Sequence, residues 1–381
     1  MNDPGPPLPF HRRSLFLAVP FVAFFSLLAL VEIAVRSTLP HLSSLDVFVT
    51  APRQQAQFLD RSNVRVFEGD ALLFWRLIPN LHDLLWKATP VSTNAQSLRY
   101  DHAVGPKPAG SFRIVCAGDS VTFGYRVPRV YTHKNQGTLG GLSYPLLLEK
   151  WLRAANPGRT IEVIPLATPG YSSHQGLAWL RRDIGWLQPD VVTACFGWND
   201  IGLRSQSDAA TMKTDWLSVT ARRLLSHSQA LVHASRWLRF RRGTPRPDTV
   251  RRVSRERYVD NLLEMARLAR GHGASPVLIG SVYRDRVAHP PEGDVIGADR
   301  AALRDAAREA GVPYLEVGEL TEDAYPANAR LFEEHIHPNH RGHRVLAVAL
   351  LDFLRDQGLL DGLAVPKVPP PGQEGAEEPP S

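Results

Sequence analysis

The sequence predicts an α/β protein built around a parallel sheet, and three observations support that prediction. Between residues 112 and 362, short apolar runs of strand type alternate with longer segments whose apolar residues recur at helical spacing. Strands that alternate with helices are typical of a parallel sheet covered on both faces. Glycine and polar residues directly follow several of the apolar runs, at the carboxyl edge where open α/β sheets bind ligands.

The composition is that of an ordinary globular protein. Of the 381 residues, 44% are hydrophobic and 22% are charged, which allows a sizeable core. The net charge is +6, but no helix-turn-helix, zinc-finger or RNA-binding signature accompanies it, so we expect no nucleic-acid partner. Cys116 and Cys195 lie within apolar runs and are expected to be buried, while the sequence leaves their pairing open.

Residues 14–36 form an almost wholly apolar segment that predicts a transmembrane signal anchor. At ~1.5 Å rise per residue, a helix of this length crosses a hydrocarbon core of ~30 Å. The alternative is a cleaved signal peptide, but the run exceeds the usual ~7–15 apolar residues and no clean cleavage site follows. Glu32, near the far end, is expected to reach the lipid headgroups.

Arg12 and Arg13 set the expected orientation of this segment. Basic residues favour the cytoplasmic side, so residues 1–13 are expected to form a cytoplasmic tail. Everything after Arg36 then lies outside the cytoplasm, which is the periplasm in a Gram-negative bacterium.

After the apolar segment, residues 37–110 are expected to form an extended lead-in with short strands rather than a separate core. Residues 111–362 are expected to form the main domain, and 363–381 a disordered Pro-rich tail. The expected strands are Phe112–Ala117, Ile161–Leu166, Val191–Phe196, Pro276–Ser281 and Pro313–Val317. The expected helices are Tyr144–Ala155, Ser172–Trp186, Arg257–His272 and Ala298–Ala310.

Two insertions interrupt the main domain. Residues 126–142 are Gly-rich and polar, and are predicted to form a rim or lid. Residues 201–257 are long and basic, with apolar residues such as Leu224 and Trp237 beside many arginines. This pattern fits either an amphipathic helix on a membrane surface or an ordinary surface helix with a solvated Arg face.

The first apolar run ends in Gly118-Asp119-Ser120. Ser120 is therefore expected at the ligand-binding edge of the sheet, and Gly118 and Gly124 allow backbone to come close to a ligand. A serine so placed can act as a nucleophile if a base reaches it. Because Gly-Asp-Ser is also common in plain turns, this stretch needs support from the rest of the chain.

Two further strand ends supply hydrogen-bond donors. Gly170 follows the second run and offers an unobstructed backbone N–H. Gly197-Trp198-Asn199-Asp200 follows the third run. The side-chain amide of Asn199 can donate to an oxyanion, whereas Asp200 is expected to brace the loop.

A late loop supplies a histidine. Glu334 precedes His337 by three residues, so its carboxylate can orient the ring and leave the other nitrogen as a base, with Glu333 a lesser candidate for that role. Histidines 335, 337, 340 and 343 also raise the alternative of a metal site. Zinc sites recruit ligands from other segments at defined spacing, and no such motif stands out, so we expect neither a metal nor a cofactor.

These segments resemble the four ordered blocks of the SGNH (GDSL) hydrolase family. The blocks are Gly118-Asp119-Ser120-x-Thr122-x-Gly124, Gly170, Gly197-x-Asn199-Asp200 and Glu334-x-x-His337-Pro-Asn. The resemblance implies a flavodoxin-like three-layer α/β/α sandwich with a five-stranded parallel sheet. The lead-in is similar to that of membrane-anchored bacterial members, which carry Asn-x-x-Gly-x-Arg; here Asn94 to Arg99 has Ser97 in place of that glycine.

The resemblance also implies roles for individual residues. Ser120 is the nucleophile, His337 the base, and Glu334 stands where the family usually has Asp. The backbone N–H groups of Ser120 and Gly170 and the amide of Asn199 form the oxyanion hole. Asp119, Gly197 and Asp200 are expected to support the site.

A membrane-anchored serine esterase outside the cytoplasm is therefore predicted, with an ester or acylated glycan as substrate. One alternative keeps the site but changes the acceptor, giving an O-acyltransferase or deacetylase that modifies an exported polysaccharide. Another is a glycan-binding protein with a decayed site, which only the Glu334 substitution supports. The Gly-x-Ser-x-Gly motif of α/β-hydrolases is absent around Ser120, which disfavours that fold.

Overall fold

A five-stranded parallel sheet lies at the centre of the computed structural model, which describes residues 10–42, 64–130, 138–139, 141–241, 247–282, 295–317, 331–334 and 336–368. The strand order is β13-β12-β9-β5-β8, and every neighbouring pair is parallel. In chain order this is 2-1-3-4-5, the flavodoxin-like arrangement, so the predicted fold class is confirmed. The strands are β5 (Phe112–Gly118), β8 (Ile161–Ala167), β9 (Val191–Cys195), β12 (Ser275–Ile279) and β13 (Tyr314–Leu315).

Side chains of the central strand alternate between two hydrophobic cores, one on each face of the sheet. Ile114 and Cys116 pack with residues of α5 and α12, whereas Val115 and Ala117 pack with residues of α6 and α10. This period of two is what a strand buried on both faces requires. The helices are α5 (Tyr144–Ala155), α6 (Ser173–Leu187), α10 (Arg255–Gly271), α11 (Val295–Glu309) and α12 (His340–Asp356).

The lead-in packs into the core on the α6 and α10 face. It contains two antiparallel hairpins, β1 (Phe67–Asp70) with β2 (Phe74–Leu77), and β3 (Leu84–Trp86) with β4 (Thr89–Val91). Trp75 and Trp86 are buried in the same hydrophobic cluster as the sheet. The lead-in therefore has no core apart from that of the main domain, while residues 43–63 lie outside the described part of the chain.

The first insertion begins after the short helix α4 (Ser120–Phe123). Within it, β6 (Arg129–Val130) pairs with β7 (Thr138–Leu139). Residues 131–137, on which the predicted rim depends, lie outside the described residues.

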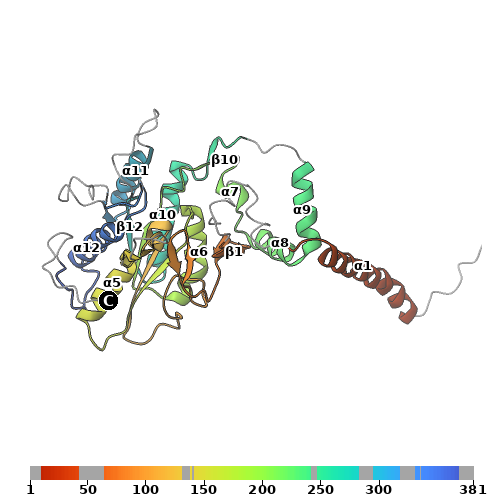
Figure 1. Cartoon of the computed structure of the whole chain (residues 1–381), viewed down its shortest axis with the longest axis horizontal. Coiled ribbons are helices and arrows are strands. Elements are labelled where there is room, and N and C mark those ends of the chain that lie inside the picture. Colours follow the sequence, from red (N-terminus) through yellow and green to blue (C-terminus); the bar gives the residue numbers. More distant parts are fainter. Residues whose placement is uncertain are drawn as a thin grey trace, which may run out of the picture.

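The second insertion leaves the body as a separate group of helices (Figure 1). Its strands β10 (Leu203–Arg204) and β11 (Val250–Arg251) pair at its base. Beyond them lie α7 (Asp208–Thr211), α8 (Trp216–His227) and α9 (Gln229–Arg241). Helix α10 begins at Arg255, inside the predicted insertion, because Ser254 caps its first turn by accepting from the Arg257 N–H.

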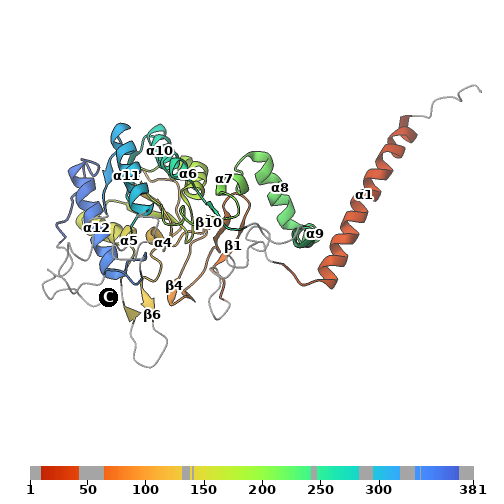
Figure 2. The same cartoon turned by 90° about the horizontal axis from the view of Figure 1, so that it is seen from above.

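Helix α1 (Phe10–Thr38) projects away from the domain, and its span Ala18–Thr38 is long and apolar enough to cross a membrane (Figure 2). The Glu32 carboxylate, near the end of this span, accepts hydrogen bonds from the Ser228 hydroxyl and from the Gln229 and Ala230 N–H groups. The expectation that Glu32 lies at the level of the lipid headgroups stays a prediction.

The predicted disordered tail is corrected at its start. Ala364 exchanges two hydrogen bonds of 2.8 Å with the Asn156 side chain, and Leu363 and Val365 pack against the core beneath α5 and α12. Burial of the Leu363 and Val365 side chains is favourable enough to order this part of the Pro-rich segment. Residues 369–381 lie outside the described part.

Candidate active site

The sheet register brings three of the predicted blocks to one edge. Gly118, the last residue of β5, pairs with Ala167 of β8 on one side and with Cys195 of β9 on the other. The loops after these three strands therefore begin at the same level. Ser120, Gly170 and Asn199 lie on these adjacent loops.

Ser120 is the first residue of α4, directly after a tight turn. A Cβ on Gly118 would lie 1.9 Å from the Thr122 hydroxyl oxygen, so only glycine lets the chain fold back this closely. Asp119 caps the short helix, since its carboxylate accepts from the Val121 N–H at 3.0 Å.

His337 lies between Ser120 and Glu334. Its Nε2 is 2.9 Å from Ser120 Oγ, and its Nδ1 is 3.1 Å from Glu334 Oε1. The carboxylate accepts a hydrogen bond from the Nδ1–H group, which leaves Nε2 to accept a hydrogen bond from the serine hydroxyl. The His337 side chain is 10% exposed, and the Tyr125 ring packs edge-on to the imidazole at 4.6 Å between centroids.

The loop that carries His337 is closed by local hydrogen bonds. The Glu333 N–H donates to the His337 carbonyl at 2.9 Å, and Asn339 caps α12 by accepting from the Arg341 and Gly342 N–H groups. Glu334 is also 3.4 Å from Arg126 Nε. The longer side chain of Glu334 thus reaches the ring, and a guanidinium lies beside its carboxylate.

The predicted oxyanion donors sit on loops with glycine-specific backbone. Gly170 has φ +84°, and Gly197 has φ +146°, where an added Cβ would lie 1.9 Å from Ser281 Oγ. The Asn199 amide nitrogen donates to Asp119 Oδ2 at 3.0 Å. An amide group carries two donors, so this bond fixes its plane and leaves the second N–H for a ligand.

A family model for GDSL-like lipases/acylhydrolases matches residues 116–345, a range that includes all four blocks. The chain belongs to the GDSL-like lipase/acylhydrolase family. Membership makes it a hydrolase of ester bonds. No match was found among curated proteins.

Several solved structures are similar to this hydrolase at low identity. One is an acetylxylan esterase from Geobacillus stearothermophilus, with 19% identity, 64% of this chain and 95% of that chain covered, and a TM-score of 0.42. Another is a lipase/acylhydrolase from Enterococcus faecalis, with 15% identity, coverage of 68% and 100%, and a TM-score of 0.43. A third is a GDSL-like lipase from Bacteroides thetaiotaomicron, with 14% identity, coverage of 67% and 93%, and a TM-score of 0.40.

Asp119 and Asp200 are both buried carboxyl groups of the hydrolase. Burial raises the pKa of Asp119 to about 6, although the Val121 N–H and the Asn199 amide stabilise its charged form. Burial raises the pKa of Asp200 to about 7. Asp200 accepts hydrogen bonds from the Ser173 N–H and hydroxyl, so it holds the start of α6 against the β9 loop.

Arg252 was missed in the sequence, and it contacts the oxyanion loop. Its Nη1 donates to the Gly170 carbonyl oxygen at 2.8 Å, and its other nitrogens bind Asp208 and Gln175. Arg252 lies near the end of the second insertion, outside the four blocks, so no sequence motif indicated that it belongs to the site.

His343 and the two cysteines of the hydrolase all lie buried in the core. His343 is fully buried, its Nδ1 accepts from the Tyr144 N–H at 3.3 Å, and burial lowers its pKa to about 3, so it is neutral. Cys116 and Cys195 are both buried free thiols. Among the described residues, no group of three or more His, Cys, Asp or Glu side chains is placed to hold a metal; His335 is not among them.

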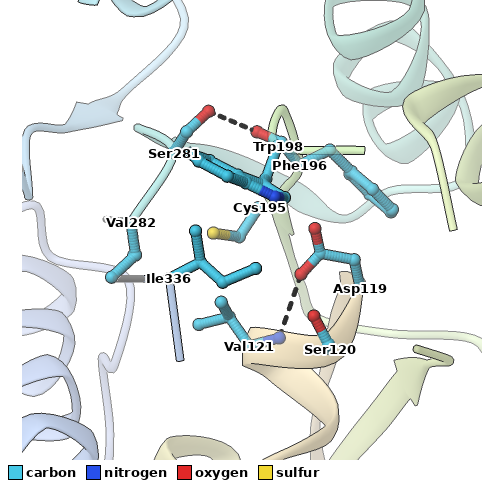
Figure 3. A pocket seen from close by; sticks show the side chains of 9 residues that line it. All are labelled: Asp119, Ser120, Val121, Cys195, Phe196, Trp198, Ser281, Val282 and Ile336. Atoms are coloured by element: carbon cyan, nitrogen blue, oxygen red, sulfur yellow. Dashed lines mark hydrogen bonds between the residues drawn. The ribbon is translucent and has the colours of Figure 1, made fainter. Parts of the chain in front are cut away.

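A small pocket of about 270 Å³ opens beside Ser120 (Figure 3). Its wall is mostly apolar, with Ile336 and Val282 facing Val121 across the space. The lining residues are Asp119, Ser120, Val121, Cys195, Phe196, Trp198, Ser281, Val282 and Ile336.

Proposed function

We propose that the chain is a serine esterase in which Ser120, His337 and Glu334 form the catalytic triad. The observation that supports this best is the continuous chain of hydrogen bonds, 2.9 Å from Ser120 Oγ to His337 Nε2 and 3.1 Å from Nδ1 to Glu334. A nucleophile within reach of a base, which a third group orients, is the arrangement that acyl transfer requires.

The reaction follows from these contacts. Ser120 Oγ attacks the ester carbonyl carbon while His337 Nε2 takes the hydroxyl proton. The backbone N–H groups of Ser120 and Gly170 and the Asn199 amide stabilise the oxyanion. The tetrahedral intermediate then breaks its bond to the alcohol oxygen, which receives the proton from His337. Water, activated by the same imidazole, hydrolyses the acyl-serine and releases the acid.

The acyl group is proposed to be short. The pocket beside Ser120 is small and lined mostly by apolar side chains. The side chains of Val121, Val282 and Ile336 suit a small apolar group, such as the methyl of an acetyl ester. Transfer of that acyl group to a sugar hydroxyl stays a prediction from the sequence.

We further propose that α1 is a retained membrane anchor with the catalytic domain outside the cytoplasm. Ala18–Thr38 has the length and apolar character of a membrane span. Glu32 of this helix accepts three hydrogen bonds from the start of α9. Removal of α1 as a signal peptide would leave these donors without their carboxylate.

The test of the mechanism compares Ser120→Ala with a matched control, Ser143→Ala, which removes a hydroxyl that caps no helix. We expect Ser120→Ala to lower hydrolysis of an aryl acetate by at least ~10³-fold and to abolish labelling by a fluorophosphonate probe. Ser143→Ala should keep both. Undiminished hydrolysis by folded Ser120→Ala protein would overturn the proposal, and equal rates on acetyl and octanoyl esters would overturn the short acyl preference.

A further inference from the structure

Helices α8 and α9 expose an unusual amount of apolar side chain. Trp216 is 75% exposed, Leu217 70% and Leu224 66% on α8, and on α9 Trp237 is 52% and Leu238 49% exposed. Two tryptophans and several leucines of this exposure cost free energy in water unless something covers them. We call residues 216–241 the α8–α9 platform.

The platform carries only basic charge. Its sequence, WLSVTARRLLSHSQALVHASRWLRFR, contains five arginines and no aspartate or glutamate. On α9, Leu231, Ala234 and Leu238 are exposed at i, i+3 and i+7, so they share one stripe. Apolar and aromatic residues beside arginines, without acidic residues, are typical of helices that lie on anionic lipid.

Hydrogen bonds fix the platform to α1. Glu32 accepts from the Gln229 N–H at 2.8 Å and the Ala230 N–H at 3.0 Å, so it caps the N-terminus of α9. Arg36 donates to the His227 carbonyl at 2.9 Å, and the Leu42 N–H donates to the Gln229 side chain. The junction of α8 and α9 is thereby held at the end of the apolar span.

The depth of this junction follows from helix geometry. Glu32 lies four residues before Arg36, the basic residue that ends the apolar run of α1, which is ~6 Å along a helix axis. The interfacial layer on each side of a bilayer is ~5–8 Å thick. In Figure 1, α9 runs across the end of α1 instead of continuing its direction, and Figure 2 shows α9 nearly end-on at the same place. If α1 crosses a bilayer, α9 therefore lies along its surface.

We propose that the α8–α9 platform lies in the headgroup layer of the anionic membrane that α1 crosses. The apolar side chains enter the acyl boundary and the arginines bind lipid phosphates. Arg222 at the same time donates to the Ala71 carbonyl at 2.6 Å, which ties the platform to the lead-in. The catalytic domain is thus held at a set height and orientation above the lipid. The proposal rests on the proposed anchor role of α1.

The test places an environment-sensitive NBD fluorophore on single introduced cysteines in the full chain. The sites are Leu217→Cys and Leu238→Cys on the platform, Leu27→Cys within α1, and Arg267→Cys on α10, whose side chain is 76% exposed. Both native cysteines are buried, so the exposed introduced cysteine should react first in the folded protein. The protein is reconstituted into vesicles of phosphatidylcholine alone or with phosphatidylglycerol, with and without doxyl-labelled lipid as quencher.

We expect quenching at positions 27, 217 and 238 and none at position 267. Quenching at 217 and 238, but not at 27, should weaken when phosphatidylglycerol is omitted or when Arg223 and Arg236 are both changed to Gln. Quenching at 27 alone would overturn the platform proposal and leave the anchor intact. No quenching at 27 would overturn the anchor, and with it the platform. If the fluorophores at 217 and 238 are shielded from water in detergent, and the protein has twice the mass of one chain, this face binds a second copy. That result would overturn the lipid proposal. Esterase activity, measured in detergent, reports on the proposed function separately.

Discussion

At the scale of single residues, Glu334 is the position where the site departs from the Asp that the family resemblance implies. Its carboxylate reaches His337 Nδ1 at 3.1 Å despite the extra methylene. The side chain is 32% exposed, and Arg126 lies beside it. A partly solvated carboxylate stabilises the imidazolium less than a buried one, because water screens the interaction.

Glu334→Gln is therefore expected to lower kcat by ~10–10²-fold, less than the ~10⁴-fold known for a buried triad aspartate. Steady-state kinetics on an aryl acetate measures this. The matched control is Glu333→Gln, because the backbone N–H of Glu333, and not its carboxylate, donates to the His337 carbonyl. Equal losses in the two variants would contradict the assignment of Glu334 as the acid.

Arg252 supplies the second prediction at this scale. Its bond to the Gly170 carbonyl fixes the peptide loop on which the oxyanion donor lies. Arg252→Lys keeps the charge beside Asp208 but loses the planar fork. We expect kcat to fall by about tenfold with little change in KM, because an oxyanion donor acts mainly in the transition state.

The control for Arg252 is its neighbour. Arg251→Lys changes a side chain that pairs with Asp299, so kcat should stay near wild type. Thermal unfolding of both variants separates a loss of folding from a loss of positioning. If Arg252→Lys raises KM and leaves kcat unchanged, or if Arg251→Lys lowers kcat by as much, the positioning role of Arg252 is wrong.

Sequence patterns predicted the convergence of Ser120, Gly170, Asn199 and His337, because each follows a strand or sits in a loop with its own local signature. Arg252 has no such signature. A single arginine in a basic insertion finds its partners only through tertiary packing. The bond between Asn199 and Asp119 was missed for the same reason, since it joins side chains from two different strand ends.

At the scale of elements, the strands and helices of the sheet were predicted within a few residues, because buried runs and amphipathic periods are local patterns. The edge strand β13 is shorter than predicted, with Leu278 and Ile279 as its pairing partners in the sheet. The contacts by which the lead-in packs against the main domain could not be predicted from local sequence patterns. Arg99 is half-buried there and donates to four backbone carbonyls, those of Pro90, Phe123, Gly124 and Val127.

Arg99 thus ties the lead-in to the turn that follows the nucleophile. Burial lowers its pKa to about 10, so the guanidinium stays charged at neutral pH. Arg99→Met leaves four carbonyl acceptors without this donor, and we expect the free energy of unfolding to fall by ~3–5 kcal/mol. Urea denaturation in detergent measures it, and a loss below ~1 kcal/mol would contradict the role.

Ser97 lies two residues earlier, at the position where the resemblance of the lead-in implies a glycine. It has φ +63°, and its hydroxyl is buried without a hydrogen-bond partner among the described residues. Ser97→Gly should raise the free energy of unfolding by about 0.5–1 kcal/mol, because a left-handed conformation costs a residue with a Cβ. Ser97→Ala keeps the Cβ, so it separates backbone strain from hydroxyl burial. An equal gain in both variants would show that φ is not the cause.

At the scale of the whole molecule, lead-in and sheet share one hydrophobic cluster. The lead-in contributes large side chains that include Leu73, Trp75, Trp86 and Leu98, all buried. Trp75 also donates to the Pro169 carbonyl and accepts from the Tyr171 hydroxyl, next to Gly170. The family match begins at residue 116, so it does not include this part of the core.

Two truncations test whether the catalytic domain folds without the lead-in. The described part of the lead-in buries ten large apolar side chains in the shared cluster. At ~1.5–3 kcal/mol each, their loss costs ~15–30 kcal/mol, which exceeds the ~5–15 kcal/mol stability of a typical domain. A chain that starts at Ser111 should therefore fail to unfold cooperatively and should lack esterase activity. A chain that starts at Val64 loses α1 but keeps the shared core, and in mild detergent it should retain both properties. Circular dichroism against temperature and the aryl acetate assay decide the outcome. Cooperative unfolding of the shorter chain would mean that the sheet and its helices suffice, and that the lead-in only covers them.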